Sequence, residues 1–256
     1  MLTPIKDKIK RNNTASVIRS VLPTGSIVKS YCFYDGRPEF DICSDSKIFV
    51  AAQTISKQVY IFWECLRRDG DRLYDIVNSP DFDFQNPELF DVYQEKWHTY
   101  ESPYIQAAFF YLLNKCSQTG KVSSGKLSLE GFNPLGLSRL KSFRFPENFH
   151  LKFEPQSTRQ FLTQDTTQQE YLMISGGDFS YSLLQEGKSV GVEETPLNFR
   201  EISKLMSLRN SKVILTHNYH KAVERFYKNC RFMLVDDYGN QTNNREMAKE
   251  IVVVNF

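Results

Sequence analysis

Short apolar runs alternate with amphipathic segments along this chain of 256 residues, and this alternation limits the possible folds more than any other feature. Runs of strand length, bounded by turn residues, lie at 27–34, 47–52, 171–174, 213–215, 231–235 and 250–254. Segments whose apolar residues recur at helical spacing lie at 15–22, 56–66, 73–77, 89–97, 103–113, 198–208 and 219–227. This order predicts an α/β fold with a mostly parallel sheet and helices on both faces.

The end of the chain and its middle depart from this alternation. The last two predicted strands are joined by a polar loop without a helix, so we expect an antiparallel hairpin at one edge of the sheet. Residues 117–155 show little periodicity and are rich in Gly, Ser, Lys and Phe, which predicts an irregular structure. We therefore predict an α/β domain formed by residues 1–78 and 165–256, interrupted by a helical and loop subdomain at 79–164.

Composition narrows the function classes. Hydrophobic residues make up 41% of the chain and aromatic residues 14%, which is enough for a packed core and argues against disorder. The net charge of +2 is small, so a nucleic-acid surface would have to be a local patch. The five cysteines include no C-x-x-C pair, which favours buried, reduced thiols. No apolar run has the length of a membrane span, and residues 1–13 lack the apolar core of a secretory signal, so we expect a soluble, intracellular (cytoplasmic) protein with no membrane partner.

The most basic segment lies at 121–144. It holds five cations against the single acid Glu130, and Phe132 and Phe143 lie among them. The cations are Lys121, Lys126, Arg139, Lys141 and Arg144. Cations on a loop rich in Gly and Ser suit contacts to phosphate groups. A solvated loop with ordinary lysines would have the same composition, so both interpretations stay open.

His217 and His220 have the His-x-x-His spacing of some metal sites. No Cys, Asp or Glu partner stands out beside them, and no H-E-x-x-H motif occurs. We therefore predict no metal site.

A more specific pattern lies at 106–115, which reads Q-A-A-F-F-Y-L-L-N-K and is followed by Gly120 and by G-F-N-P-L-G at 131–136. In order and spacing these residues resemble the DNA adenine methylase (Dam) family, in which an A-x-x-F-x-x-L-N-(K/R) helix precedes a glycine and an F-N-x-P-x-G loop. The apolar run at 213–218, ending in T-H-N, and E-I-V-V-V-N at 250–255 are similar to the final part of that family.

The resemblance implies a Rossmann-like class I methyltransferase sheet that uses S-adenosylmethionine and acts on duplex DNA. In that family the first of these regions leads into the part that contacts DNA. The resemblance therefore implies DNA contacts from Asn114, from Lys115 and from the five cations of the basic segment.

The residues that would bind the cofactor are eroded. The family's first strand leads into F-x-G-G-G, whose glycines let the main chain approach the methionine part of the cofactor. Here only Phe33 and Gly36 remain, while Arg37 would fill cofactor space and Pro38 lacks an N–H. The family also places an Asp for the ribose hydroxyls at the end of the second strand, where this chain has the neutral Gln53. The resemblance thus implies a degenerate cofactor set of Phe33, Gly36 and Gln53.

The catalytic tetrad of the family is D-P-P-Y, whose Asp accepts a hydrogen bond from the adenine amine and whose Tyr stacks on the flipped base. Direct alignment puts S-G-G-D at 175–178, without a carboxylate at the first position. A shift by three residues gives D-F-S-Y from Asp178 to Tyr181, which recovers both residues but neither proline. We favour the direct alignment.

Loss of three motifs together predicts a catalytically inactive methyltransferase-like protein, without a bound cofactor, that acts as a DNA-binding or scaffold subunit of a larger complex. The alternative is a divergent, active adenine-N6 DNA methyltransferase that binds S-adenosylmethionine and uses Asp178 and Tyr181. A third hypothesis is a purely structural role in which the DNA surface is also lost.

Overall fold

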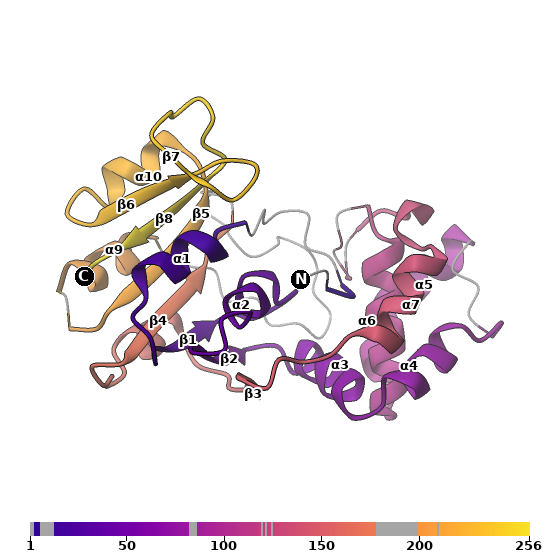
Figure 1. Cartoon of the computed structure of the whole chain (residues 1–256). Helices are drawn as coiled ribbons and strands as arrows, with labels where there is room; N and C mark the ends of the chain where they lie inside the picture. Colours follow the sequence, from indigo (N-terminus) through magenta and orange to yellow (C-terminus); the bar gives the residue numbers. More distant parts are fainter. Residues whose placement is uncertain are drawn as a thin grey trace.

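The computed structural model describes residues 3–5, 13–81, 86–118, 120, 122–123, 125–177, 199–208 and 210–256. These residues form an eight-stranded mixed sheet with helices on both faces, and a helical lobe lies beside one edge of the sheet (Figure 1). We use helical lobe for the part of the chain from α4 to α7. The prediction of an α/β fold is confirmed.

The strands lie in the order β3-β2-β1-β4-β5-β8-β6-β7. Their bounds are β1 Ile27–Tyr31, β2 Phe49–Thr54, β3 Phe149–Phe153, β4 Glu170–Ser175, β5 Val213–Asn218, β6 Arg231–Val235, β7 Gln241–Thr242 and β8 Glu250–Val254. The five strands from β3 to β5 are parallel, whereas β8 pairs antiparallel with both β5 and β6. The predicted antiparallel C-terminal hairpin is therefore present, with its second strand, β8, inserted between β5 and β6.

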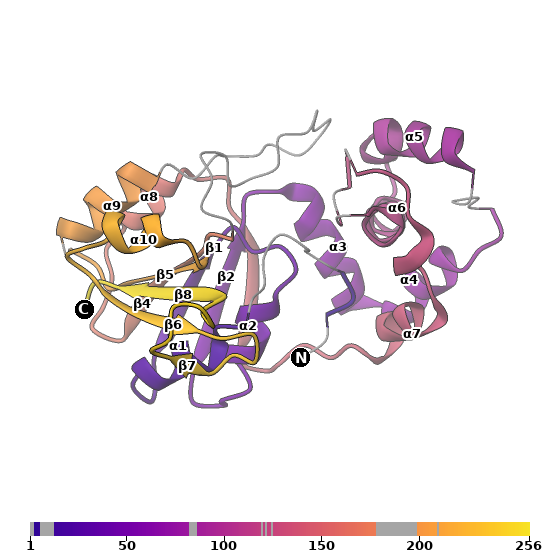
Figure 2. The same cartoon turned by 90° about the horizontal axis from the view of Figure 1, so that it is seen from above.

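The helices cover the sheet from two sides (Figure 2). Their bounds are α1 Ala15–Val21, α2 Arg37–Ile42, α3 Lys57–Arg68, α4 Gly70–Val77, α5 Pro87–Lys96, α6 Pro103–Cys116, α7 Pro134–Ser142, α8 Thr158–Leu162, α9 Phe199–Leu208 and α10 Lys221–Phe226. Helices α1 and α2 lie on one face of the sheet, and α8, α9 and α10 lie on the other. Two short 3₁₀ helices are also present: Trp97–Thr99 precedes α6 and Leu129–Gly131 precedes α7.

Local sequence explains α3 and α6. The side chain of Ser56 caps α3 by accepting a hydrogen bond from Val59 N at 3.3 Å, and the predicted apolar stripe of this helix is buried. In α6 every residue from Ala107 to Cys116 is buried. A helix that is buried all round lies at the centre of its packing unit, and α6 is the centre of the helical lobe.

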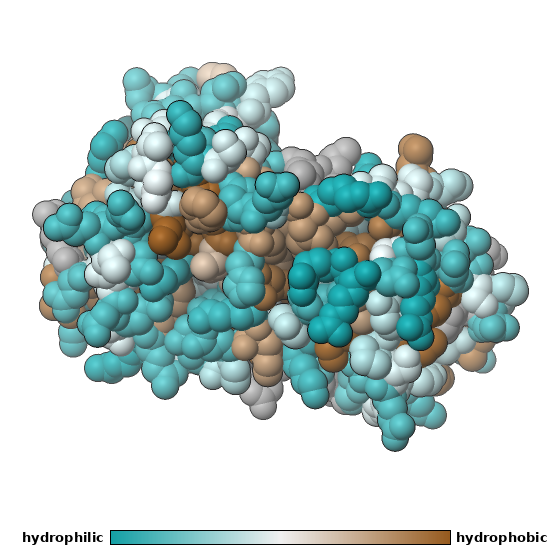
Figure 3. All heavy atoms as spheres, turned by 60° about the horizontal axis from the view of Figure 1, so that its bottom comes forward, coloured by the Kyte–Doolittle hydropathy of each residue, from teal (hydrophilic) through white to brown (hydrophobic). Residues whose placement is uncertain are grey.

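Two apolar clusters form the core, one on each face of the sheet. Successive strand residues point to opposite faces, so Met173 belongs to one cluster and its neighbours Leu172 and Ile174 to the other. The larger cluster runs without a break from Val28 in the sheet to Phe109 in α6. On the face in Figure 3, apolar residues gather in the middle, where the sheet and the lobe meet. The lobe is thus joined to the sheet by packing.

The prediction of an irregular structure at 117–155 is wrong for part of that range. It contains α7, and β3 pairs in parallel with β2 from Val50↔Phe149 to Thr54↔Phe153. The strand signal is the alternation around Leu151, which is buried while both of its neighbours are exposed. The chain predicted as an inserted subdomain, 79–164, therefore contributes a strand to the sheet.

A second difference lies after β1. No helix is predicted between the apolar runs at 27–34 and 47–52, but α2 begins at Arg37, directly after Gly36. Gly36 has a φ of 74°, which L side chains rarely adopt, and Pro38 lies in the first turn of the helix, where its fixed φ is favourable.

Candidate functional site

The turn between β1 and α2 is filled with aromatic rings. Phe33 is 2% exposed, and its ring centroid lies 5.8 Å from that of Phe40 and 5.5 Å from that of Trp63. A β-carbon built on Gly36 would lie 2.7 Å from Phe40 Cδ2 and 2.9 Å from Phe33 Cε2. The side chain of Phe40 therefore covers Gly36. The predicted obstruction by Arg37 stays a prediction. A ligand cannot approach this glycine from the covered side.

Hydrogen bonds hold the same turn in place. Trp63 Nε1 donates to the main-chain oxygen of Tyr34 at 2.8 Å, and Phe33 N donates to Gln53 O at 3.0 Å. Behind the turn, Ser30 Oγ donates to the buried carboxylate of Glu39 at 2.5 Å. Glu39 is an acid that sequence reasoning missed, because only the helix after Gly36 directs it back onto β1.

Gln53 lies near the end of β2, beside this turn. It is 3% exposed, and its Nε2 has no hydrogen-bond partner among the described residues. An amide in place of a carboxylate carries no charge and offers one acceptor oxygen beside a donor, so Gln53 cannot accept two hydroxyl protons as an Asp can. The structure thus brings the predicted set of Phe33, Gly36 and Gln53 to one edge of the sheet, but all three residues are buried.

The end of β4 carries the run S-G-G, beginning at Ser175. Gly176 N donates to Thr216 O at 2.8 Å, and Asn218 N donates to Gly177 O at 2.7 Å, so the ends of β4 and β5 continue to pair. His217 lies below Gly176, 1% exposed, between the rings of Phe199 and Tyr227. Burial lowers the pKa of His217 to about 3, so its ring is neutral at physiological pH. Asp178 and Tyr181 lie outside the described residues.

Two residues predicted to contact DNA are buried in α6. Asn114 is fully buried, and its Nδ2 donates to Gly120 O at 2.8 Å. Lys115 is 6% exposed, with its Nζ 5.7 Å from the centroid of the Tyr111 ring. Neither side chain reaches the surface, because α6 is central to the lobe. Both side chains are therefore buried in this conformation, and the DNA contacts expected of them stay a prediction.

A hairpin follows α6. Ser117 and Leu127 form an antiparallel bridge, and Ser128 N donates to Cys116 O. We call the described residues 117, 118, 120, 122, 123 and 125–128 the α6–α7 hairpin. Gln94 of α5, which sequence reasoning missed, clamps it: its Nε2 donates to Val122 O at 3.1 Å and to Gly125 O at 2.9 Å. A Gln on the apolar side of a predicted helix was the available signal.

The remaining predicted cations lie on or after this hairpin. Lys126 and Arg144 are exposed and Arg139 is partly exposed. Lys141 Nζ lies 3.9 Å from Asp71 Oδ1, 4.0 Å from Asp75 Oδ1, and 4.1 Å from the centroid of the Tyr74 ring. The two carboxylates partly balance the charge of Lys141, so Lys126, Arg139 and Arg144 carry most of the positive charge here. Lys121 lies outside the described residues.

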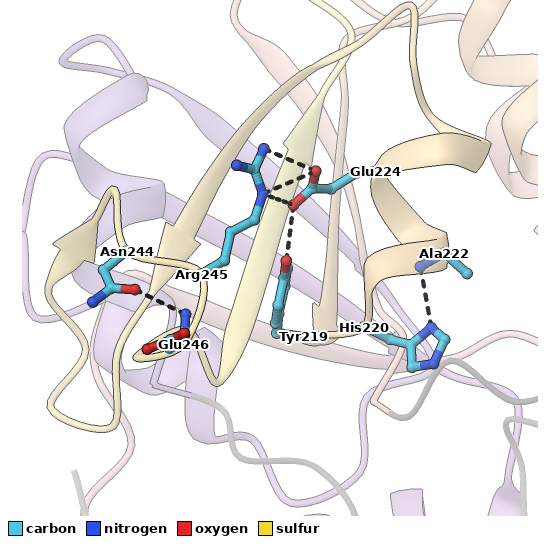
Figure 4. Close-up of polar contacts among 7 residues, drawn as sticks. All are labelled: Tyr219, His220, Ala222, Glu224, Asn244, Arg245 and Glu246. Atoms are coloured by element: carbon cyan, nitrogen blue, oxygen red, sulfur yellow. Dashed lines mark hydrogen bonds and ion pairs between the residues drawn. The ribbon is translucent and has the colours of Figure 1, made fainter.

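A polar cluster lies at the end of β5 (Figure 4). Glu224 Oε1 accepts hydrogen bonds from Tyr219 OH and from Arg245 Nε, both at 3.0 Å, and Arg245 NH2 donates to Glu224 Oε2 at 3.1 Å. The hydrogen bonds from Arg245 lower the pKa of Glu224, and burial together with Glu224 raises the pKa of Tyr219. The cluster ties the loop before β8 to α10.

His220 accepts a hydrogen bond from Ala222 N at the start of α10, as Figure 4 shows, whereas His217 is buried below Gly176. The two histidines therefore belong to different surroundings. Within the described part of the chain, no three His, Cys, Asp or Glu side chains gather in a way that could hold a metal ion.

No protein-family model matches this chain, and no curated protein sequence matches it. Of the helices in the described ranges, none is long and apolar enough to cross a membrane.

Proposed function

We propose that this chain is a catalytically inactive protein of the DNA adenine methylase type that binds duplex DNA. The observation that carries the proposal is the ring of Phe40 over Gly36, where the related enzymes need bare main chain to hold S-adenosylmethionine. A protein that keeps this fold but has the space beside Gly36 filled can retain its binding surfaces while it loses methyl transfer.

The sheet supports the first half of the proposal. Five parallel strands are followed by a reversed hairpin whose second strand, β8, lies between β5 and β6. A doubly wound sheet that ends in such a hairpin is the usual architecture of cofactor-dependent methyltransferases, and the resemblance of residues 106–136 to the Dam family agrees with it.

The residues at the carboxyl ends of β1 and β2 do not fit S-adenosylmethionine. Aromatic rings fill the space beside Gly36, and the Tyr34 carbonyl is engaged by Trp63. The residue at the ribose position, Gln53, is neutral and buried. Each change by itself weakens binding of S-adenosylmethionine. Together they remove the open main chain at Gly36, the free carbonyl of Tyr34 and the carboxylate that would accept hydrogen bonds from the ribose.

The α6–α7 hairpin and the start of the chain after α7 support the DNA-binding half. Lys126 and Arg144 are exposed there, and Arg139 is partly exposed between them in sequence. Exposed cations on a loop contact phosphate groups without sequence specificity, and each such contact releases a counterion from the duplex.

Calorimetry with S-adenosylmethionine tests the loss of the cofactor. We expect no binding heat at millimolar ligand, whereas a micromolar dissociation constant would overturn the assignment. A parallel assay follows labelled methyl groups on duplex oligonucleotides, some containing GATC. Methyl transfer that depends on the protein and disappears in the Asp178→Asn variant would establish the active alternative instead.

Retention on duplex DNA tests the binding surface. Lys126→Glu and Arg144→Glu should weaken binding, and the slope of log K against log salt should fall by roughly one for each phosphate contact that is lost. Lys204→Glu, on the exposed side of α9, is the matched control and should change neither quantity. If all three variants bind alike, the hairpin is not the DNA surface and a scaffold role remains.

A further inference from the structure

Tyr34 links two parts of the molecule that are far apart in sequence. It lies in the turn after β1, and its hydroxyl donates to Gly120 O of the α6–α7 hairpin at 3.3 Å. The same hydroxyl accepts a hydrogen bond from Asn114 Nδ2 at 3.4 Å, and that nitrogen also donates to Gly120 O at 2.8 Å. One carbonyl of the hairpin is therefore held by two side chains at once.

The tyrosine itself is fixed at both ends. Its main-chain oxygen accepts the hydrogen bond from Trp63 Nε1 at 2.8 Å. Its ring lies edge-on to Phe110 of α6, with the centroids 6.0 Å apart. A phenol whose main chain and ring are both packed presents its hydroxyl in one place, so it can orient a partner without losing much entropy.

The carbonyl that Tyr34 holds has a particular position in the hairpin. Gly120 has a φ of 86°, a conformation that reverses the chain, and its carbonyl belongs to the peptide bond that leads to Lys121. The two hydrogen bonds fix the direction of that carbonyl. The second clamp, from Gln94 to Val122 O and Gly125 O, fixes the chain just beyond it.

We infer that Tyr34 is a positioning residue for DNA binding, which holds the α6–α7 hairpin in its binding conformation from the turn that would bind cofactor in an active enzyme. The part of this inference that concerns DNA affinity rests on the proposed function. On this inference, the turn after β1 no longer binds a cofactor. Its role is to hold the hairpin that carries Lys126 in place.

The test is the Tyr34→Phe variant, which keeps the ring against Phe110 and removes only the hydroxyl. Amide hydrogen exchange in the peptides that cover the hairpin should accelerate by about threefold to tenfold, the effect of one lost hydrogen bond. The carbonyl carbon of Gly120 should shift in the NMR spectrum, and the affinity for duplex DNA should fall by a similar factor. The melting temperature of the protein should stay close to that of the unsubstituted chain.

Tyr31→Phe is the matched control, because the Tyr31 hydroxyl donates to Gln156 O and does not contact the hairpin. It should leave the hairpin exchange and the DNA affinity unchanged. Unchanged exchange and an unshifted Gly120 carbonyl in Tyr34→Phe would overturn the positioning role. Faster exchange with unchanged DNA affinity would overturn the link to binding. If the unsubstituted protein does not bind DNA, the proposed function fails, and the exchange and NMR results alone decide whether Tyr34 holds the hairpin.

Discussion

The imidazole ring of His217 lies so close to the main chain of Gly176 that a β-carbon at Gly176 would come within 2.6 Å of ring atoms Cε1 and Nδ1. The end of β4 therefore passes directly over a buried, neutral histidine of β5. In the direct alignment with the Dam family, this is the place of the catalytic tetrad. Packing against His217 is enough to require a glycine at position 176, so no catalytic role is needed to explain it.

Gly176→Ala should destabilise the protein by about 1–3 kcal/mol, because the added methyl group overpacks against the ring. Urea unfolding of the variant measures the loss. The same substitution in a His217→Ala background should cost less, since the ring is gone, although Thr216 O still lies 2.8 Å from the added carbon. An equal cost in both backgrounds would show that the ring is not the obstacle.

His217 should make the protein less stable in acid. Its pKa in the folded state, about 3, lies below the usual value of about 6.5, so the unfolded chain binds the proton more readily between these two values. Its contribution to stability is complete above about pH 6.5 and is lost as the pH falls, by about 2 kcal/mol at pH 5. Urea unfolding at pH 7.5 and pH 5 measures this loss.

The comparison of two variants isolates the histidine. His217→Gln should lose this part of the pH dependence whatever its overall stability, whereas His150→Gln changes an exposed residue and should keep it. If the stability of the two variants depends on pH in the same way, the buried ring is not the source.

Asn255 should be one of the more sensitive polar residues. Its Oδ1 accepts from Val213 N at 2.7 Å, and its Nδ2 donates to Met206 O at 3.0 Å and Ser211 O at 2.9 Å. Asn255→Ala leaves these main-chain groups without their partner and should cost about 2–4 kcal/mol in unfolding free energy. Asn244→Ala, at an exposed turn, should change stability by less than about 0.5 kcal/mol. Thermal unfolding of both variants would contradict this account if their midpoints matched.

Arg245→Gln should raise the pKa of Glu224, because the hydrogen bonds from the guanidinium are the main cause of its lowering. An acid whose pKa is lowered in the folded state stabilises the protein above its ordinary pKa, and this stabilisation is lost as the pH falls. The stability of the variant should therefore depend less on pH in the acid range. NMR titration of the Glu224 carboxyl carbon measures the shift directly. Arg225→Gln, an exposed neighbour on α10, should leave this titration where it was.

The regular part of the fold follows from local patterns. Apolar runs of strand length predict β1, β4, β5, β6 and β8 to within a few residues, and the stripe of α3 predicts a helix that is capped and buried as expected. The strand β3 was missed because its alternation at Phe149–Phe153 lies in a region dominated by Gly, Ser and charged residues. Helix α2 was missed because Gly36 and Pro38 indicate a turn as readily as the start of a helix.

The candidate site was less accessible to sequence reasoning. The sequence predicts that Arg37 blocks the turn after β1; it does not predict that the ring of Phe40 also covers Gly36, as the structure shows. It predicts surface contacts from Asn114, whose amide is instead a buried clamp on Gly120. A motif records which residue types recur at a spacing, but the same Asn can bind a ligand or a loop, and only the partner in space distinguishes the two.

The sequence by itself determined the α/β fold class, because the period of the apolar residues decides locally which face of each strand or helix is buried. Only the tertiary structure decided what fills the turn after β1 and what holds the α6–α7 hairpin. Phe33 and Phe149 meet only when β3 joins the sheet, and Tyr34 and Asn114 meet only when the lobe packs against the sheet. Contacts between residues so distant along the chain leave no periodic trace in it.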